Sequence, residues 1–199
     1  MALDSTKVVY GISRIFRQDF DPTGTLDVPD PDTQGFGDPG GSWVELGLTQ
    51  DFLTFRAAVD YAEINADQYA DPVARVLESR DVGLSGNLIE ITPQNISHAL
   101  GFGTVSTQAA GAGTRGYDRY RMTDDTTEQL AAILADFQNP GNGEFGRVFI
   151  PKARPSGSVE SAFGNRVEAV QIPFDMAALP DDSREPTVTL DIYIYTPAA

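Results

Sequence analysis

The chain has 199 residues, with 14 Lys and Arg against 29 Asp and Glu, so its formal net charge is −15, and it contains no cysteine and a single histidine. The lack of cysteine excludes a disulfide framework, a thiol nucleophile and a cysteine-ligated zinc site, and one histidine excludes a zinc site built from several imidazoles. The excess negative charge repels a phosphate backbone, so we expect no tight nucleic-acid binding, although this charge is compatible with contact that does not lead to adhesion.

Length and composition indicate one domain, residues 1–199, that is rich in strands and turns. Hydrophobic residues make up 41% of the chain, and the 19 Gly and 13 Pro favour many turns. The first residues lack the apolar core of a signal peptide, and no apolar run is long enough for a membrane helix. We therefore expect a protein that is made in the cytoplasm without membrane insertion.

The N-terminal part is expected to form a strand followed by an acidic arm. Residues 7–16 are β-branched and aromatic, which favours a strand. Residues 19–38 hold six Asp, three Pro and three Gly with no Lys or Arg. This composition predicts a long solvated loop or arm over about 19–41, because Pro interrupts regular structure while Asp and Gly favour turns.

Two long strands and a short helix follow. Apolar and polar residues alternate over 53–61, which is the period of a strand with one buried face, and a second stretch of this kind is centred on 82–88. In TPQNISHALG, Thr92 can cap a helix, Pro93 suits its first position, and Gly101 can adopt the left-handed stop. The sequence therefore predicts one helix of about two turns that packs on a sheet.

The C-terminal half is expected to be mainly strands. Residues 102–123 are rich in Gly, Thr and Ala and predict a flexible loop. The segment 128–137 has both helical spacing and strand alternation, so the pattern alone leaves the two open. Strands are predicted at 147–154, within 166–179 and at 186–195. Together these elements predict a mainly β sandwich or partly closed barrel with one short flanking α-helix and long loops or arms.

Motifs that could carry chemistry are weak. His98 lies beside the apolar stripe of the predicted helix, where a structural histidine is the ordinary interpretation, and no G-x-S-x-G motif supplies a nucleophile for it. GAGTRG at 111–116 lacks the strand and helix of a dinucleotide site. Asp30 and Asp32 resemble the start of a Ca²⁺ loop, but Gly41 stands where the bidentate Glu belongs. We expect no catalysis, cofactor or dedicated metal site, with opportunistic Ca²⁺ or Mg²⁺ binding as a less favoured alternative.

Several stretches in order resemble the major tail tube protein of long-tailed, siphovirus-like phages. SWVELGLTQDFLTF at 42–55 is similar to the family's entry into its first long strand. Residues 64–103 resemble its central block of an Asp-Gln dipeptide, a Pro-Val, a hairpin and a T-x-x-N-I/L-x-x-A-L-G helix. FIPKARPSGSVESAF at 149–163 and VQIPFDMAAL at 170–179 resemble its next strands. The acidic stretch 19–38 departs from the pattern in being longer and more acidic.

The resemblance implies a structural virion protein of the tail, without enzyme activity. In that family six subunits form a ring, their long hairpins join into one continuous barrel, and the rings stack into the conduit through which DNA leaves the particle. The implied partners are further copies of the chain, the tape measure protein, the tail terminator and the distal tail proteins, and DNA passes without specific binding. The resemblance also favours a strand over a helix at 128–137.

Residue roles follow from the same resemblance. Residues 52–65 and 76–91 are expected to form the barrel wall, and the candidates for the lumen are the polar side chains Thr54, Arg56, Asp60, Asp81, Ser85 and Asn87. Contacts between subunits or rings are expected from the arm 19–41, the 66–75 loop tip and the segment 102–123, with the candidate residues Asp19, Asp21, Asp27, Asp30, Asp32, Asp38, Asp67 and Asp71. Deletion of 19–38 is expected to leave a folded monomer that no longer polymerises.

Two alternatives keep the same fold class. The tube protein of a contractile injection or secretion machine would share the fold and differ by having a sheath partner. A non-viral, acidic carbohydrate- or Ca²⁺-binding β-sandwich module would be a stable monomer with exposed aromatic patches.

Overall fold

A computed structural model describes residues 13–26, 28–65, 67–69, 71–124, 127–138, 143–161 and 170–195 of the chain. Within these residues the chain is mainly β with one helix, which confirms the predicted fold class. The elements are β1 (Ser13–Asp19), β2 (Val44–Glu45), β3 (Thr49–Ile64), β4 (Ala74–Leu88), α1 (Pro93–Leu100), β5 (Thr104–Gln108), β6 (Tyr117–Arg121), β7 (Ala131–Gln138), β8 (Phe145–Pro155), β9 (Ile172–Ala178) and β10 (Asp191–Ile194).

The main sheet is antiparallel and curls until its two ends almost meet. Its strand order is β2-β1-β7-β8-β9-β4-β3, and β10 pairs with one end of β8. The end strands β2 and β3 are consecutive in the chain, so residues 46–48 join the two ends of the sheet. The Leu46 N–H donates to the carbonyl of Ile15, and the Ile89 N–H donates to that of Leu48, each over 3.0 Å. The sheet is therefore a partly closed barrel.

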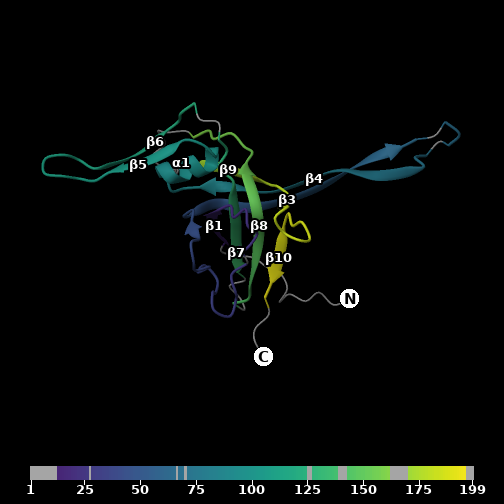
Figure 1. Ribbon diagram of the computed structural model, residues 1–199, viewed down its shortest axis with the longest axis horizontal. Helices are drawn as coiled ribbons and strands as arrows, with labels where there is room; N and C mark the ends of the chain where they lie inside the picture. The colour runs from purple at the N-terminus through teal and green to yellow at the C-terminus, as the bar shows by residue number, and fades with distance from the viewer. Residues whose placement is uncertain are drawn as a thin grey trace.

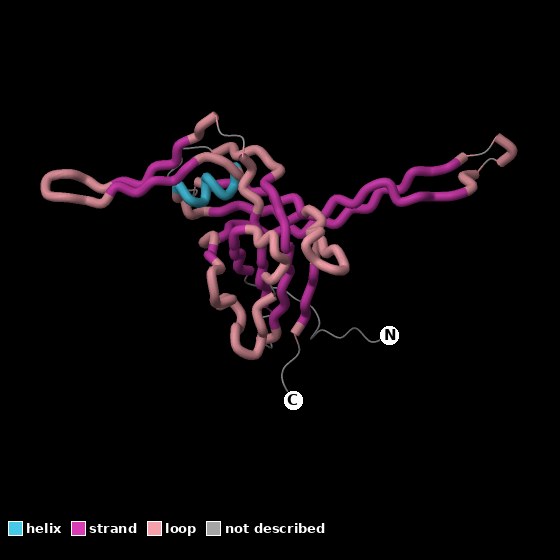
Figure 2. Tube along the Cα trace, in the orientation of Figure 1, coloured by secondary structure: helices cyan, strands magenta, loops and turns pink. Residues whose placement is uncertain are grey.

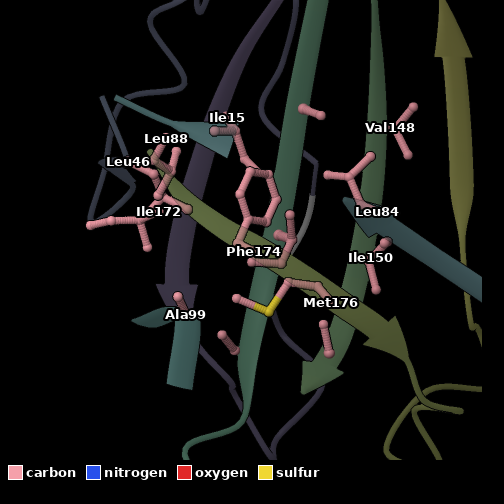
Figure 3. Packing of buried hydrophobic residues seen from close by; sticks show 14 residues of the cluster. Ile15, Leu46, Leu84, Leu88, Ala99, Val148, Ile150, Ile172, Phe174 and Met176 are labelled. Atoms are coloured by element: carbon pink, nitrogen blue, oxygen red, sulfur yellow. The ribbon is translucent and has the colours of Figure 1, made fainter. Parts of the chain in front are cut away.

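The main hydrophobic core fills the inside of this curled sheet. Figure 3 shows side chains of β1 and β8 on one side facing those of β4 and β9 on the other. α1 closes the core at one end through Ala99. The fully buried members include Ile15, Leu46, Leu84, Leu88, Ile133, Ile150, Ile172 and Met176.

The helix forms where the sequence predicts it. The Thr92 hydroxyl accepts a hydrogen bond from the Asn95 N–H over 3.1 Å, Pro93 opens the first turn, and Gly101 ends the helix with φ +79°. A helix of eight residues is too short to persist alone. Asn95 fixes it to the sheet, because its side-chain amide donates to the carbonyls of Leu46 and Glu90.

Residues 128–137, whose pattern fits both a helix and a strand, contain most of strand β7. This confirms the prediction of a strand. Residues 131–136 are all buried, because both faces of β7 are covered. Ala131, Ile133 and Ala135 belong to the main core, whereas Ala132 and Leu134 belong to a second cluster on the outer side. A strand buried on both faces loses its alternation and cannot be told from a helix by period alone.

The acidic loop covers that second cluster and is not a free arm. The loop between β1 and β2, described over residues 20–26 and 28–43, lies against the outer face of β1, β7 and β8, and Trp43 meets Phe149 edge to face with ring centroids 6.2 Å apart. Leu26 and Val28 pack on the same cluster. Of the two predicted forms, loop or arm, the structure shows the loop, and its packing on the second cluster contradicts a free arm. We therefore no longer expect deletion of 19–38 to leave a stably folded monomer.

Two hairpins leave the body in opposite directions (Figures 1 and 2). One is the long β3–β4 hairpin, and the other is β5–β6. The prediction of a flexible loop at 102–123 is wrong, because 104–108 and 117–121 pair as strands and the motif at 111–116 forms the turn at their tip. The many Gly and Thr residues of this segment are typical of loops, so its composition did not indicate the strand pairing.

The predicted terminal strands differ in extent from those in the structure. β1 spans 13–19, and the expected residues 7–12 lie outside the described part of the chain. The expected strand 186–195 is regular only over 191–194, where β10 pairs with β8, while Val188 makes an isolated bridge with Asp181. Leu190 packs on the main core, but Ile192 and Ile194 of β10 are 50% and 70% exposed, so only the first part of the predicted apolar side is covered among the described residues.

Candidate lumen and assembly surfaces

The polar side chains predicted to line a lumen share one face of the β3–β4 hairpin, which we call the polar face. Thr54 pairs directly with Ser85, and Asp60 pairs with Ser79. Directly paired residues project to the same side, and side chains alternate along each strand. Every candidate falls on this side: Thr54, Arg56, Asp60, Asp81, Ser85 and Asn87.

The polar face is negative despite its arginine. Arg56 lies between two carboxylates, with its Nε 2.8 Å from Asp81 and one terminal nitrogen 3.5 Å from Asp175 of β9. The hydrogen bond to Asp81, then the charges of both aspartates, raise the pKa of Arg56. Asp60 accepts a hydrogen bond from Ser79 over 3.1 Å. One cation and three carboxylates leave a charge of 1 − 3 = −2 on this part of the face.

An open hollow of about 530 Å³ lies at the base of the polar face, where β4 and β9 meet residues 157–158. Its lining supplies hydroxyl and amide groups and a single carboxylate, so it lacks the pair of carboxyl groups that most glycoside hydrolases use. Among the described residues, no group of three or more His, Asp or Glu could hold a metal ion. The lining residues include Thr54, Ser85, Asn87, Ser158, Pro173 and Asp175.

The opposite side of the hairpin, which we call the apolar face, is exposed to solvent. Phe55, Val59, Tyr61 and Leu77 are 38%, 48%, 58% and 41% exposed. Phe55 pairs with Leu84, which belongs to the main core, so the apolar face continues the core surface beyond the body. The prediction of one buried face therefore holds only at the base of the hairpin. This face also carries Arg80, which pairs with Val59, and the ion pair of Arg75 with Glu63. A surface with several large exposed apolar side chains marks an interaction site.

The hairpin tip carries the two candidate contact residues that lie in neither β1 nor the acidic loop. Asp67 and Asp71 are exposed in the turn between β3 and β4. Figure 1 shows this tip far from the loop between β1 and β2. The structure therefore does not bring Asp67 and Asp71 together with the other candidate aspartates.

The first aspartates of the acidic loop are engaged within the chain. Asp19 is the last residue of β1 and lies 2.8 Å from the guanidinium of Arg17. Asp21 accepts hydrogen bonds from the side chains and backbone N–H groups of Thr23 and Thr25. These bonds, those from the hydroxyls first, lower the pKa of Asp21. Both carboxylates thus shape the start of the loop.

The aspartates further along the loop face solvent. Asp30, Asp32 and Asp38 are exposed, and Asp27 lies outside the described residues. The Asp30 carboxylate accepts a hydrogen bond from the Asp32 N–H over 3.0 Å, which is a local turn contact. We call Asp30, Asp32 and Asp38 the acidic patch. Their contact with another chain stays a prediction.

A buried ion pair that the sequence analysis missed fixes the shape of this loop. The Nε of Arg147 in β8 donates to Asp136 in β7 over 2.9 Å, and neither side chain is exposed. The rest of the guanidinium donates to carbonyls of the loop, including those of Pro29 and Gln34 over 2.7 and 2.6 Å. Asp136 accepts the Gly37 N–H over 2.9 Å. An aspartate inside the apolar run AAILADF was the signal, because buried charges need partners.

His98 is half-buried on α1 and close to the end of β1. Burial, with a smaller contribution from the charge of Arg17, lowers its pKa to about 4. Its Nδ1 has no hydrogen-bond partner among the described residues. A neutral imidazole at this boundary fits the structural interpretation of the residue.

Comparison with known proteins adds no family assignment. No protein-family model matches the chain, and no curated protein sequence matches it. Among the described residues, no helix has the length and apolar character needed to cross a membrane.

Proposed function

We propose that this chain is the subunit of a tail tube, in which hexameric rings stack into a hollow conduit for DNA in the tail of a virion. The observation that carries the proposal is the β3–β4 hairpin. It extends from the body with an exposed apolar face on one side and a negative polar face on the other. Among the described residues, nothing covers either face of its outer part.

The length and edge of the hairpin favour assembly with further copies. Its first strand has 16 residues, which corresponds to roughly 50 Å at about 3.3 Å per residue. A long strand with an unpaired edge and an exposed apolar side invites pairing with another chain. If neighbouring hairpins pair edge to edge in a closed ring, they remove the free edges and cover the apolar faces.

Charge supports placing the polar face toward the lumen. A wall that bears carboxylates and hydroxyls repels phosphate, so DNA can move along it without adhering. The net charge of −15 makes retention of DNA by counterion release unfavourable. This fits a conduit whose task is passage and not binding.

The test is electron microscopy of the purified protein, combined with two lysine substitutions at adjacent positions. Val59 and Ala58 are both exposed on β3 and project to opposite faces. Val59→Lys replaces an exposed apolar side chain by a second cation opposite Arg80, so we expect the variant to remain monomeric. Ala58→Lys puts the same charge on the polar face, so we expect tubes. Both variants should remain folded, because neither side chain is in the core, although the lysine opposite Arg80 should lower the melting temperature of Val59→Lys slightly.

Two results would count against the proposal. Wild-type protein that stays monomeric across concentration and salt would contradict a tube subunit and favour a monomeric binding module. Tubes formed equally well by Val59→Lys would contradict the assignment of the apolar face to subunit contact.

A further inference from the structure

The β5–β6 hairpin is a positively charged element in a strongly acidic chain. Residues 104–121 contain Arg115, Arg119 and Arg121 against Asp118, so their charge is 3 − 1 = +2, while the whole chain carries −15. Figure 1 shows this hairpin leaving the body near α1 and pointing away from it. We call residues 104–121 the basic arm.

The arginines of the basic arm have no acidic partner within the described part of the chain. Arg119 donates to the hydroxyl of Ser106 over 3.3 Å, and none of the three makes an ion pair there. Aromatic surface lies beside them, because Tyr117 is 55% exposed. Exposed Arg and Tyr together are typical of residues that dominate protein interfaces.

The complementary charge lies at the other end of the same sheet. Arg147 holds the loop that carries the acidic patch, and Gly101, from which the basic arm follows, lies against Pro155. These two positions are eight residues apart on β8, which corresponds to roughly 26 Å. The arm points outward from its own end, so it and the patch of one chain cannot meet.

We propose that the basic arm of one copy docks on the acidic patch of a second copy. The two surfaces differ, so the contact is head to tail, and such contacts repeat without limit unless the rotation closes. Attraction between opposite charges also orients the approaching subunit. The inference rests on the proposed function and deepens it, because a contact of this kind would join one ring to the next.

Charge exchange between two variants tests the pairing. The arm variant carries Arg115→Glu and Arg121→Glu, and the patch variant carries Asp32→Lys and Asp38→Lys; all four side chains are exposed. Each variant alone would place like charges at every junction. We expect sedimentation to show a critical concentration for assembly that is raised roughly tenfold or more, because like charges across an interface oppose association. An equimolar mixture, and a chain with all four changes, should assemble like the wild type.

A matched control separates the effect of the docking contact on assembly from the effect of the changed net charge. Asp182→Lys and Glu185→Lys change the net charge as much as the patch variant does, at exposed positions outside the loop. This control should assemble normally, and circular dichroism should show that every variant is folded. Assembly by the arm and patch variants alone, or failure of their mixture, would overturn the inference.

The design also distinguishes this inference from the function on which it rests. Wild-type protein that forms no rings or tubes would contradict the proposed function itself. Wild-type tubes together with normal tubes from the arm variant would contradict only the pairing. If those arm-variant tubes also lost an affinity for duplex DNA that wild-type tubes have, the basic arm would be a nucleic-acid contact and the docking proposal would be wrong.

Discussion

One buried arginine determines the conformation of a loop that is otherwise rich in turns and negative charge. The guanidinium of Arg147 donates hydrogen bonds at once to the Asp136 carboxylate and to backbone carbonyls within residues 29–35. A guanidinium has five N–H donors in a fixed geometry, which suits it to several acceptors on one loop. The acidic side chains then face outward because the backbone is turned inward to the arginine.

Replacing this arginine should therefore destabilise the whole body. Arg147→Met leaves the Asp136 carboxylate buried without its cation, and we expect unfolding in urea to show a loss of about 3–5 kcal/mol. The exposed Arg154 of the same strand provides the control, and Arg154→Met should change stability by less than about 0.5 kcal/mol. Hydrogen exchange at residues 28–37 should accelerate only in the first variant. Equal stability of the two variants would show that the buried pair contributes nothing.

His98 predicts a pH dependence whose sign can be worked out. Its pKa falls from 6.5 to about 4 in the folded chain. Between these values the unfolded state binds more protons than the folded state, so the free energy of unfolding decreases as pH falls from about 6.5 to about 4. Because the ring is half-buried, we expect a loss on the order of 1 kcal/mol across this window.

Urea unfolding at pH 7.5 and pH 4.5 measures this loss. His98→Gln removes the titrating group, so the part of the pH dependence that differs between wild type and variant belongs to His98. Parallel curves for the two proteins across the window would show that the pKa of His98 is not lowered on folding.

At the scale of elements, the sequence predicted correctly those helices and strands whose formation depends on neighbouring residues. Thr92, Pro93 and Gly101 specify the helix within ten residues, and the alternation over 53–61 specifies a strand. The structure adds what depends on distant segments: β7 loses its alternation because both faces are buried, and 104–121 pairs although its composition resembles a loop. The pairing of Arg147 with Asp136 could not be predicted, because only the tertiary fold places the loop over them.

The end of α1 offers a test of packing against a neighbouring strand. Gly101 has φ +79°, and a Cβ added there would lie 2.7 Å from the side chain of Pro155. Gly101→Ala should therefore reduce stability by about 1–3 kcal/mol, since backbone strain and a close contact act together. In the turn of the basic arm, Gly111 has no atom within 4 Å of such a Cβ, so Gly111→Ala is the control. Thermal unfolding should separate the two variants, and equal melting temperatures would contradict the packing argument.

At the scale of the whole molecule, the charge of −15 is unevenly distributed. Acidic side chains gather on the outer loop and on the polar face of the β3–β4 hairpin, while the basic arm is the opposite in sign. Strand alternation placed the candidate lumen residues on a shared face. The alternation could not show which face meets solvent, a neighbouring subunit or a lumen, because it sorts side chains onto two sides of the strand but does not indicate what each side contacts.

Reversing charge on the polar face tests its placement directly. Asp60→Lys with Asp81→Lys removes two carboxylates and adds two cations, leaving Arg56 close to Asp175. We expect tubes of this variant to retain short duplex DNA at low salt and to release it as salt rises, whereas wild-type tubes should retain none.

Nuclease sensitivity of the retained DNA then decides where the polar face lies. DNA held inside a tube is shielded from an added nuclease by the wall, so the retained duplex should survive digestion. Asp182→Lys with Glu185→Lys makes the same change in net charge away from the hairpin, and any DNA it attracts should be digested. Retained DNA that is digested in the Asp60 and Asp81 variant would place the polar face on the outside of the tube. Protection combined with reversal by salt would leave electrostatic repulsion as the reason that the native wall lets DNA pass, because the reversed charges at Asp60 and Asp81 are the only difference between the two tubes.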